Sequence, residues 1–286
     1  MAIMDGKKIS KEILQSLEGE VSALNKKHIY PQIAVILVGK DPASLLYVRK
    51  KQAACSEIGI LWQQFDFDEK EVTTEKLIEK ITELNEDEKV HGILVQVPLP
   101  KHVNTPLVMR AINPKNDVDG FTAYNLGKMF LSSDFEHLVP CTPLGVMRML
   151  EHHKINVEGK EVVIVGHSNI VGKPLAVMFM NRNATVTVCH KFTKNLAEHT
   201  KRADILCVGV GKINLITADM VKDGAIVIDI GINHTKDGKI CGDVDFDGVS
   251  KKASLITPVP GGVGPMTVAC LMENTVTAAK RLNNLT

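Results

Sequence analysis

The sequence lacks several features, and each absence excludes a class of protein. Its 286 residues carry a formal net charge of only +1, so the basic excess of a nucleic-acid-binding protein is missing. No apolar run approaches the roughly 20 residues that are needed to span a bilayer. The first residues, from Met1 to Lys8, contain no apolar stretch of the kind that forms a signal peptide. We therefore expect no nucleic-acid partner and no membrane span.

Metal-binding patterns are also missing. The six cysteines form no C-x-x-C pair, and several lie in apolar runs, where a free cysteine behaves as a small hydrophobic residue. Residues 243–248 match the first half of a calcium loop, but the twelfth position is Ser254 instead of a glutamate. We interpret this segment as a turn, predict no metal site, and expect a reduced, cytoplasmic setting.

Short apolar runs alternate with helical periodicity along the whole chain, without repeats or a low-complexity linker. Alternating strands and helices predict parallel sheets with helices on both faces, which is an α/β fold, and the length is sufficient for two domains. Strands are predicted at 33–38, 61–67, 92–97, 161–165, 185–189, 205–208, 225–230 and 254–257. The main helices are predicted at 9–24, 42–58, 74–84, 104–112, 143–153 and 268–282.

The most informative segment is residues 161–174. A buried strand is followed by Gly166, which turns the chain, and by Ser168, Gly172 and Pro174, which open a helix. A strand, a glycine turn and a helix N-terminus together offer backbone N–H groups and a positive dipole end to a diphosphate. The spacing is G-x-S-x-x-x-G and not G-x-G-x-x-G, so an ordinary strand-to-helix turn stays open as an alternative. The segment predicts a dinucleotide-binding domain in the second half of the chain.

The end of the next predicted strand bears on which dinucleotide is bound. An acidic residue at this place would hold the ribose hydroxyls of NAD. Cys189 is instead followed by a segment without a carboxylate and with two ammonium groups, His190-Lys191-Phe192-Thr193-Lys194. This pattern favours NADP over NAD, although lysines that only face solvent would produce it as well.

In the first half, Tyr47 and Lys51 stand four residues apart on the predicted helix 42–58 and share one face. A lysine near an apolar wall loses basicity and can act as an acid–base group, whereas a charge run such as 49–51 is more often solvated. Gln96 lies among Leu and Val near the end of a predicted strand and needs a hydrogen-bond partner, which a lysine head can provide.

Two loops add to this candidate site. Asp117 and Asp119 place two carboxylates on one loop, a pattern that an Asx turn also explains. Residues 258–265 are so rich in glycine that we expect their backbone to lie close to a ligand. The X-Pro bonds in this loop and at 98–100 are candidates for the cis form.

Taken together, these segments closely resemble the bifunctional methylenetetrahydrofolate dehydrogenase/cyclohydrolase family in its bacterial form, without an appended ligase domain. The motifs follow the order of the family from one end of the chain to the other. They are Tyr47-x-x-x-Lys51, Gly92-Ile-Leu-Val-Gln-Val-Pro-Leu-Pro100, Lys115-Asn-Asp-Val-Asp-Gly120, Pro140-Cys-Thr-Pro143, Gly166-His-Ser-Asn-Ile-Val-Gly172 and Thr257-Pro-Val-Pro-Gly-Gly-Val-Gly-Pro-Met-Thr267.

The resemblance implies two α/β domains with a cleft between them. Residues 1–141 would form an N-terminal substrate domain that binds folate, with the C-terminal helix 266–286 packed back on it, and residues 142–265 a Rossmann-like, parallel-sheet NADP domain. It also implies a homodimer, tetrahydrofolate derivatives as substrates, and NADP as cofactor, with NAD less favoured. The implied enzyme is an oxidoreductase and a hydrolase of one-carbon metabolism, which supplies purine, histidine and methionine biosynthesis.

The implied reactions are the oxidation of 5,10-methylenetetrahydrofolate to the methenyl form and its hydrolysis to 10-formyltetrahydrofolate. By position, Lys51 matches the catalytic lysine of the family, and Gln96 the residue that hydrogen-bonds it. Tyr47 matches a tyrosine that stacks on the folate, and Asp119 the carboxylate that holds the pterin edge. Folate-lining positions are implied for Gly264 and Pro265. Dinucleotide contacts are implied for Gly166, His167, Ser168, Lys191 and Ile232.

Two positions depart from the pattern of some members, and three alternatives stay open. His167 stands in place of an arginine or a small residue, and Lys191 in place of arginine or serine, which leaves the NADP preference to be tested. The first alternative is another two-domain NAD(P)-dependent dehydrogenase, of shikimate or amino-acid type. The second is a non-catalytic dinucleotide-binding sensor, and the third is a dehydrogenase that lacks cyclohydrolase activity.

Overall fold

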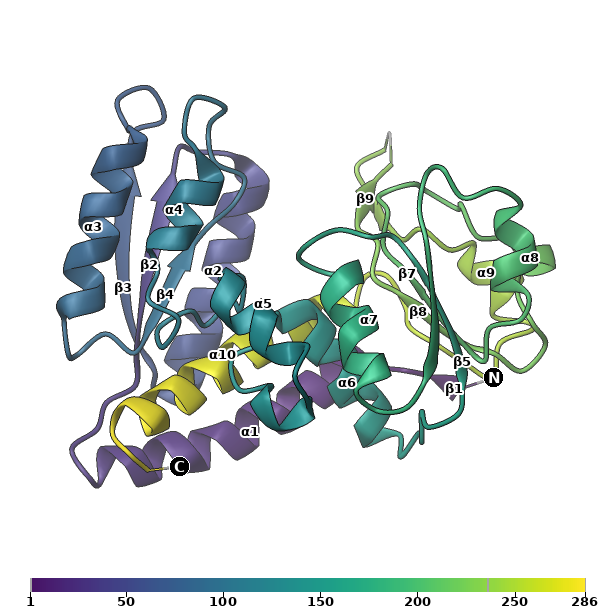
Figure 1. Cartoon of the computed structure of the whole chain (residues 1–286), viewed down its shortest axis with the longest axis horizontal. Helices are drawn as coiled ribbons and strands as arrows, with labels where there is room; N and C mark the ends of the chain where they lie inside the picture. Colours follow the sequence, from purple (N-terminus) through teal and green to yellow (C-terminus); the bar gives the residue numbers. More distant parts are fainter. Residues whose placement is uncertain (1, 236, 286) are drawn as a thin grey trace. The chain divides into compact units, whose positions relative to one another are not determined.

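The computed structural model describes residues 2–235 and 237–285, which divide into two compact units (Figure 1). Unit 1 comprises residues 2–11, 129–133 and 142–267, and unit 2 comprises residues 12–128, 134–141 and 268–285. Each unit contains a parallel sheet covered by helices, so the predicted α/β class is confirmed. In the part of the chain described, no helix is both long and apolar enough to cross a membrane.

The sheet of unit 2 has three parallel strands in the order β3-β2-β4. The central strand β2 is almost entirely buried, which explains its continuous apolar run. One face packs on α3 and α4 through Ile36, Leu77 and Val108, among other buried side chains. The strands are β2 (Gln32–Val38), β3 (Leu61–Phe67) and β4 (Gly92–Val95), and the helices of this part are α2 (Pro42–Ile58), α3 (Thr74–Glu86), α4 (Thr105–Ala111) and α5 (Ala123–Met129).

The sheet of unit 1 has six parallel strands in the order β1-β11-β8-β7-β5-β6. From β5 the chain builds β6 on one side and then returns to build β7 on the other, so the strand order reverses between β5 and β7. Ligands of such sheets bind at the carboxyl ends of the strands beside this reversal. The strands are β1 (Ala2–Ile3), β5 (Glu161–Val165), β6 (Thr185–Cys189), β7 (Ile205–Val208), β8 (Ile226–Asp229) and β11 (Leu255–Ile256).

Short helices and one small hairpin complete unit 1. Helix α7 (Gly172–Met180) follows β5 and packs on β5 and β6. The other helices are α6 (Cys141–His152), α8 (Leu196–Thr200) and α9 (Phe246–Val249); the first residue of α6, Cys141, belongs to unit 2. The 3-10 turn is η2 (Ala218–Met220), and the hairpin is formed by β9 (Asn233–His234) and β10 (Ile240–Cys241). Unit 2 has a further 3-10 turn, η1 (Ser133–Phe135), which begins in unit 1.

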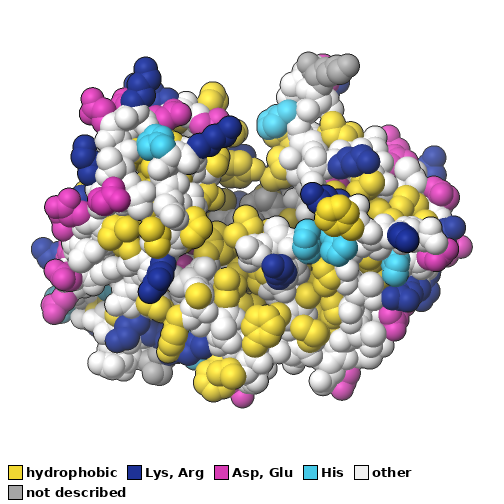
Figure 2. Space-filling model, turned by 45° about the horizontal axis from the view of Figure 1, so that its top comes forward, with side chains coloured by type: hydrophobic (Ala, Val, Ile, Leu, Met, Phe, Trp, Pro, Cys, Tyr) yellow, Lys and Arg dark blue, Asp and Glu magenta, His cyan; other side chains and the backbone are white. Residues whose placement is uncertain are grey.

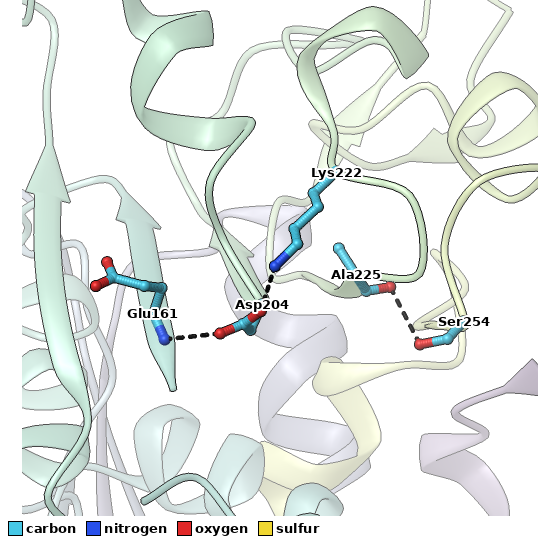
Figure 3. Close-up of polar contacts among 5 residues, drawn as sticks. All are labelled: Glu161, Asp204, Lys222, Ala225 and Ser254. Atoms are coloured by element: carbon cyan, nitrogen blue, oxygen red, sulfur yellow. Dashed lines mark hydrogen bonds and ion pairs between the residues drawn. The ribbon is translucent and has the colours of Figure 1, made fainter. Parts of the chain in front are cut away.

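Polar contacts connect residues at the amino ends of the unit 1 strands (Figure 3). The carboxylate of Asp204 accepts the backbone N–H of Glu161 at 3.0 Å and the ammonium of Lys222 at 2.6 Å. Ser254 donates its hydroxyl to the carbonyl oxygen of Ala225 at 3.4 Å. These residues lie at the opposite edge of the sheet from the strand ends that bind ligands in this fold.

Most predicted elements are confirmed, and the differences have local causes. The strand predicted at 92–97 ends at Val95, ahead of the cis peptide bond Val97–Pro98. Helix α3 has the predicted start and is capped by the hydroxyl of Thr73, which accepts the N–H of Lys76. The last helix, α10 (Val263–Leu282), begins five residues earlier than predicted, with Pro265 in its first turn, where no N–H is required. Helix α5 and strands β1, β9 and β10 were not predicted.

Candidate functional site

Helix α2 carries Tyr47 and Lys51 one turn apart. The helix begins where the carboxylate of Asp41 accepts the N–H of Ser44 at 2.8 Å, with Pro42 in the first turn. It ends at Gly59, whose φ of 80° is a left-handed conformation. Both ends are therefore fixed, and the partly exposed side chains of Tyr47 and Lys51 start from a defined backbone. Burial raises the pKa of the Tyr47 phenol, which stays neutral.

The amide of Gln96 connects Lys51 to the end of β4. The Lys51 ammonium donates to Oε1 of Gln96 at 3.0 Å, and Nε2 of Gln96 donates to the carbonyl oxygen of Val97 at 2.7 Å. The backbone N–H of Gln96 donates to the carbonyl oxygen of Ile36 at 2.9 Å. Because both ends of the amide are used, its oxygen is held toward Lys51. The structure thus brings these two candidate residues together.

The loop that bears Asp119 is shaped by its neighbour Asp117. The fully buried carboxylate of Asp117 accepts the backbone N–H groups of Gly120, Phe121 and Thr122 at 2.8–3.1 Å, and also the side-chain amide of Asn125. Gly120 has a φ of 73°, and a Cβ at this position would lie 2.3 Å from the carbonyl carbon of Val139. The expected Asx turn is therefore present at Asp117, and it leaves Asp119 available for another role.

Asp119 lies within electrostatic reach of Lys51. Burial raises the pKa of the Asp119 carboxyl, the charge of Lys51 lowers it, the neighbouring Asp117 raises it further, and a hydrogen bond from the thiol of Cys141 lowers it. The arrangement combines an ammonium group, a neutral amide and a carboxyl group of raised pKa. Such a set can bind a polar heterocycle and move a proton at its edge.

Asn274 was not among the predicted site residues, although it supports the Asp119 loop. Its side chain is buried on α10 and donates to the carbonyl oxygens of Val118 at 2.8 Å and Val139 at 2.9 Å. The thiol of Cys141 also donates to the carbonyl oxygen of Val118, at 3.3 Å. An asparagine in the apolar stretch of a predicted helix is the signal that could have identified this position, because a buried amide needs partners.

In unit 1, two glycines form a narrow turn after β5. Gly166 has a φ of 124°, and a Cβ on it would lie 2.4 Å from the carbonyl oxygen of Gly209 at the end of β7. A Cβ on Gly172 would lie 2.0 Å from the carbonyl oxygen of Gly166. Glycine is therefore required at both positions because the backbone segments approach one another closely, and the turn lies at the strand reversal, where ligands of this fold bind.

Ser168 accepts hydrogen bonds from the backbone N–H groups at the start of α7. Its hydroxyl accepts the N–H groups of Val171 at 3.2 Å and Gly172 at 3.4 Å, and its carbonyl oxygen accepts that of Lys173 at 3.1 Å. The expectation that these helix N–H groups are free for a diphosphate therefore needs correction. A dinucleotide site at this edge depends on the glycine turn and on the side chains beyond it.

The end of β6 presents an exposed cluster of aromatic and basic groups. The rings of His167 and His190 have centroids 5.0 Å apart, and those of His190 and Phe192 are 6.1 Å apart. The ammonium of Lys191 lies 4.8 Å from the centroid of Phe192. In Figure 2, histidine side chains are seen beside hydrophobic and basic ones on the face that is drawn. Without a carboxylate in the cluster, these residues fit a dinucleotide with an additional phosphate.

Apolar side chains line the neighbouring strand ends. Ile232 follows β8 and is 43% exposed, and Val210 follows β7 and is 41% exposed. The buried Asp243 carboxylate holds the loop after β7 by accepting the N–H of Val210 at 2.6 Å and the side-chain amide of Asn233 at 2.8 Å. Exposed apolar groups held in this way can support a flat ring. Asp243 was not predicted to shape this edge.

The Asp-rich segment 243–248 is occupied by structural contacts. Asp243 also accepts the N–H groups of Gly211 and Lys212, and Asp245 accepts that of Gly248 at the start of α9. No group of three or more His, Cys, Asp or Glu side chains within residues 2–235 and 237–285 is arranged to hold a metal ion. The carboxylates here shape the strand ends.

The predicted glycine-rich loop lies before and within the first turn of α10. The peptide bond Val259–Pro260 is cis, and a Cβ on Gly262 would lie 2.6 Å from the carbonyl oxygen of Pro258. Gly264 and Pro265 are both partly exposed, and a Cβ on Gly264 would meet no atom within 4 Å. Packing therefore does not explain the glycine at 264.

Comparisons with known proteins match both the first and the second half of the chain. Residues 4–119 match the model of the tetrahydrofolate dehydrogenase/cyclohydrolase catalytic domain, and residues 140–283 match the model of the NAD(P)-binding domain of the same name. The chain is 56% identical over 280 residues to the bifunctional protein FolD of Nautilia profundicola, with 98% of each chain covered.

Two solved structures are similar over nearly the whole chain. The bifunctional FolD methylenetetrahydrofolate dehydrogenase/cyclohydrolase of Campylobacter jejuni is 50% identical with a TM-score of 0.96, and 98% of this chain and 99% of that chain are covered. The corresponding Trypanosoma brucei enzyme, solved with NADP cofactor and inhibitor, is 36% identical with a TM-score of 0.94, and 98% of each chain is covered.

Proposed function

Since the chain belongs to the tetrahydrofolate dehydrogenase/cyclohydrolase family, we propose that Lys51 and the side chains around it perform the chemistry of its two reactions. The enzyme oxidises 5,10-methylenetetrahydrofolate to the 5,10-methenyl form with NADP and hydrolyses this product to 10-formyltetrahydrofolate. The observation that supports the assignment of Lys51 is its hydrogen bond to the neutral amide of Gln96.

Lys51 is proposed as the proton acceptor of the hydrolase step. Loss of a hydride leaves a cation delocalised between two nitrogens of the folate, and a permanent positive charge beside it would be unfavourable. Gln96 is uncharged, so it orients Lys51 without stabilising the ammonium form as a carboxylate would. Neutral Lys51 can then take the proton from the water that attacks the methenyl carbon.

The folate is proposed to be held by residues on both sides of Lys51. Tyr47, one turn earlier on α2, offers the face of its ring for stacking. Asp119 offers a carboxyl group to N–H groups of the pterin edge, and its loop is fixed by Asp117. Gly264 and Pro265 are proposed to line the folate as well, which agrees with the open space at Gly264.

NADP is proposed to bind at the carboxyl ends of the unit 1 strands. When bound, the cofactor accepts the hydride from the substrate. Gly166 allows the narrow turn that would adjoin the diphosphate, Ser168 fixes the following turn, and Ile232 would support a flat ring. His167 and Lys191 are placed to hold the additional phosphate, which favours NADP over NAD.

We propose a folate-binding domain of residues 1–141 together with helix 266–286, and an NADP domain of residues 142–265. We further propose that the enzyme is a homodimer in the cytoplasm, where its product supplies formyl groups for purine, histidine and methionine biosynthesis. The six free cysteines agree with a reducing compartment. Light scattering on the purified protein tests the dimer, and a mass of one chain would contradict it.

The activity is tested with methylenetetrahydrofolate and either NADP or NAD, by following the absorbance of the methenyl product and its decay. We expect the methenyl product to form with NADP and then to decay faster than the uncatalysed rate. The alternatives of a shikimate-type dehydrogenase and of a sensor are not supported by the family match. Absence of turnover with both dinucleotides would contradict the proposed function.

Lys51→Ala tests the catalytic assignment. We expect the variant to lose cyclohydrolase activity and to keep its fold, because Lys51 is partly exposed and the partner of its hydrogen bond, Oε1 of Gln96, belongs to a residue that is also partly exposed. Circular dichroism checks the fold. Arg49→Ala, in the same charge run, is the matched control and should retain activity. Full cyclohydrolase turnover in Lys51→Ala would refute the role of this lysine.

A further inference from the structure

Unit 2 contains a cavity that is not lined by the residues proposed to bind folate or the dinucleotide. It has a volume of about 570 Å³ and lies beside α5 and the C-terminal end of α10. Its lining includes four basic or titratable side chains, and none of the lining residues identified is an aspartate or a glutamate. These four side chains are Lys115, Lys128, His137 and Arg281.

The basic groups act on one another inside this cavity. The pKa of His137 is lowered by burial and, in addition, by the positive charges of Arg281 and Lys128. The Lys128 ammonium lies 4.9 Å from the centroid of the Tyr124 ring. Among the ion pairs identified within the described residues, none uses the side chain of Lys115, Lys128 or Arg281. Positive charge from three side chains therefore converges on this cavity.

Helix geometry alone does not account for this cluster. Basic residues in the last turn of a helix interact favourably with its dipole, which explains Lys128 on α5 and Arg281 on α10. Lys115 lies instead on the loop between α4 and α5, yet it lines the same cavity. Cations from separate segments that converge on one concave surface raise the local concentration of anions.

The wall of the cavity is rigid. Asn125 is buried, and its side-chain amide donates to the carbonyl oxygen of Pro114 at 2.9 Å and to Oδ2 of Asp117 at 3.0 Å. These bonds fix α5 against the loop that carries Lys115. A concave surface with fixed walls and a few convergent polar groups is typical of small-molecule sites, whose volumes run from about 300 to 1,000 Å³.

We propose that this cavity is a binding site for a small polyanion, a molecule with at least two phosphate or carboxylate groups, and that it is separate from the catalytic site. Arginine binds either group with two parallel N–H bonds, and lysine contributes a point charge. The volume exceeds the requirement of a single inorganic anion and leaves the Tyr124 ring available for an apolar part of the ligand.

Isothermal titration of the full-length protein with tripolyphosphate, and separately with citrate, tests the proposal and distinguishes the two ligand chemistries. We expect saturable binding of one molecule per chain for at least one of them. Lys128→Gln and Arg281→Gln should each weaken this binding about tenfold or more, equivalent to about 1.4 kcal/mol. Lys101→Gln removes the same charge from an exposed position of unit 2 outside the cavity and should leave the affinity unchanged.

Two outcomes would overturn the proposal. One is the absence of saturable binding of both probes. The other is an equal loss of affinity in Lys101→Gln, which would indicate attraction to the net charge only. The same titration with Lys191→Ala separates this cavity from the dinucleotide edge, since binding that disappears in that variant belongs to the nucleotide site and contradicts the proposal.

The pH dependence of binding is a further readout. His137 faces Arg281 of α10 and Lys128 of α5, and burial together with the charges of these two side chains disfavours its protonation; Lys115 and Tyr124 also line the cavity. A bound anion reverses this effect, so affinity should rise as the pH falls from 7.5 toward 5.5, and His137→Gln should lose the additional rise. An identical pH profile in wild type and His137→Gln would exclude His137 from the site.

Discussion

At the scale of single residues, the uncharged amide of Gln96 is the feature that sets the chemistry of Lys51. The amide is held at both ends, by Lys51 and by the carbonyl oxygen of Val97, so it presents an acceptor without a negative charge. A carboxylate at the same place would favour the ammonium form of the lysine and would oppose its use as a base.

Gln96→Glu tests this argument because it changes the charge with little change in size. A carboxylate in place of the amide that now accepts from Lys51 should favour the ammonium form of this lysine. We therefore expect the cyclohydrolase pH–rate profile to move to higher pH and the rate at neutral pH to fall about tenfold or more. Gln52→Glu, an exposed position on the same helix, is the control. An unchanged profile in Gln96→Glu would show that Gln96 does not tune Lys51.

Residue types in known motifs were predictable from the sequence, whereas supporting contacts were not. Lys51, Gln96 and Asp119 stand out because each is a polar residue in a recognisable pattern. Asn274 supports the Asp119 loop from a helix more than 130 positions away from its two carbonyl partners, so no local pattern connects them. Asp243 resembled part of a calcium loop, and its role in holding Val210 appears only in three dimensions.

At the scale of elements, the turn from β5 into α7 depends on glycine for two separate reasons. The φ of 124° at Gly166 is a backbone conformation that other residues rarely adopt, and the nearest atom to a Cβ would be the carbonyl oxygen of Gly209 at 2.4 Å. The backbone after β5 therefore lies so close to the backbone after β7 that only a residue without a side chain fits at position 166.

Gly166→Ala should weaken NADP binding by at least about tenfold, because the turn must move to relieve both the strain and the clash. Fluorescence or calorimetric titration with NADP measures this loss. Gly224→Ala is a matched control, since Gly224 has a φ of 78° but a Cβ there would meet no atom within 4 Å. Equal NADP affinity in wild type and Gly166→Ala would contradict the role of this turn.

Elements were predictable where the signal was local and periodic. β5 and β7 have the predicted bounds because buried parallel strands are continuous apolar runs, and the edge strand β6 has them because its residues alternate between Thr and Val. β1 was missed because it has two exposed residues and exists only through pairing with β11, near the other end of the chain. α5 has seven residues, including Gly127, which is too short for a clear period.

At the scale of the whole molecule, one buried carboxyl group makes stability depend on pH. Burial raises the pKa of Asp229 from 3.8 to about 6, the nearby Asp243 contributes to the rise, and backbone N–H donors partly oppose it. Between these two pH values the folded chain binds more protons than the unfolded one. The contribution of Asp229 is therefore fully present below pH 3.8 and is lost as the pH rises through about 6.

Asp229→Asn should remove this dependence. The difference in unfolding free energy between wild type and variant should shift by about 2 kcal/mol from pH 4 to pH 7, with the wild type losing stability relative to the variant. Urea denaturation followed by far-ultraviolet circular dichroism is the measurement, because the single tryptophan, Trp62, reports on unit 2 and not on unit 1. Asp247→Asn, an exposed position, is the control, and a difference independent of pH would contradict the prediction.

The pairing of β1 with β11 sets an order of events during synthesis. Ile3 finds its partner only when Ile256 has been made, 253 positions later. Translation at about 5–20 residues per second separates these two residues by roughly 13–50 s. The ribosome therefore synthesises the edge strand β1 first and its pairing partner β11 almost last. The first residues of the nascent chain are consequently among the last to be incorporated into the fold.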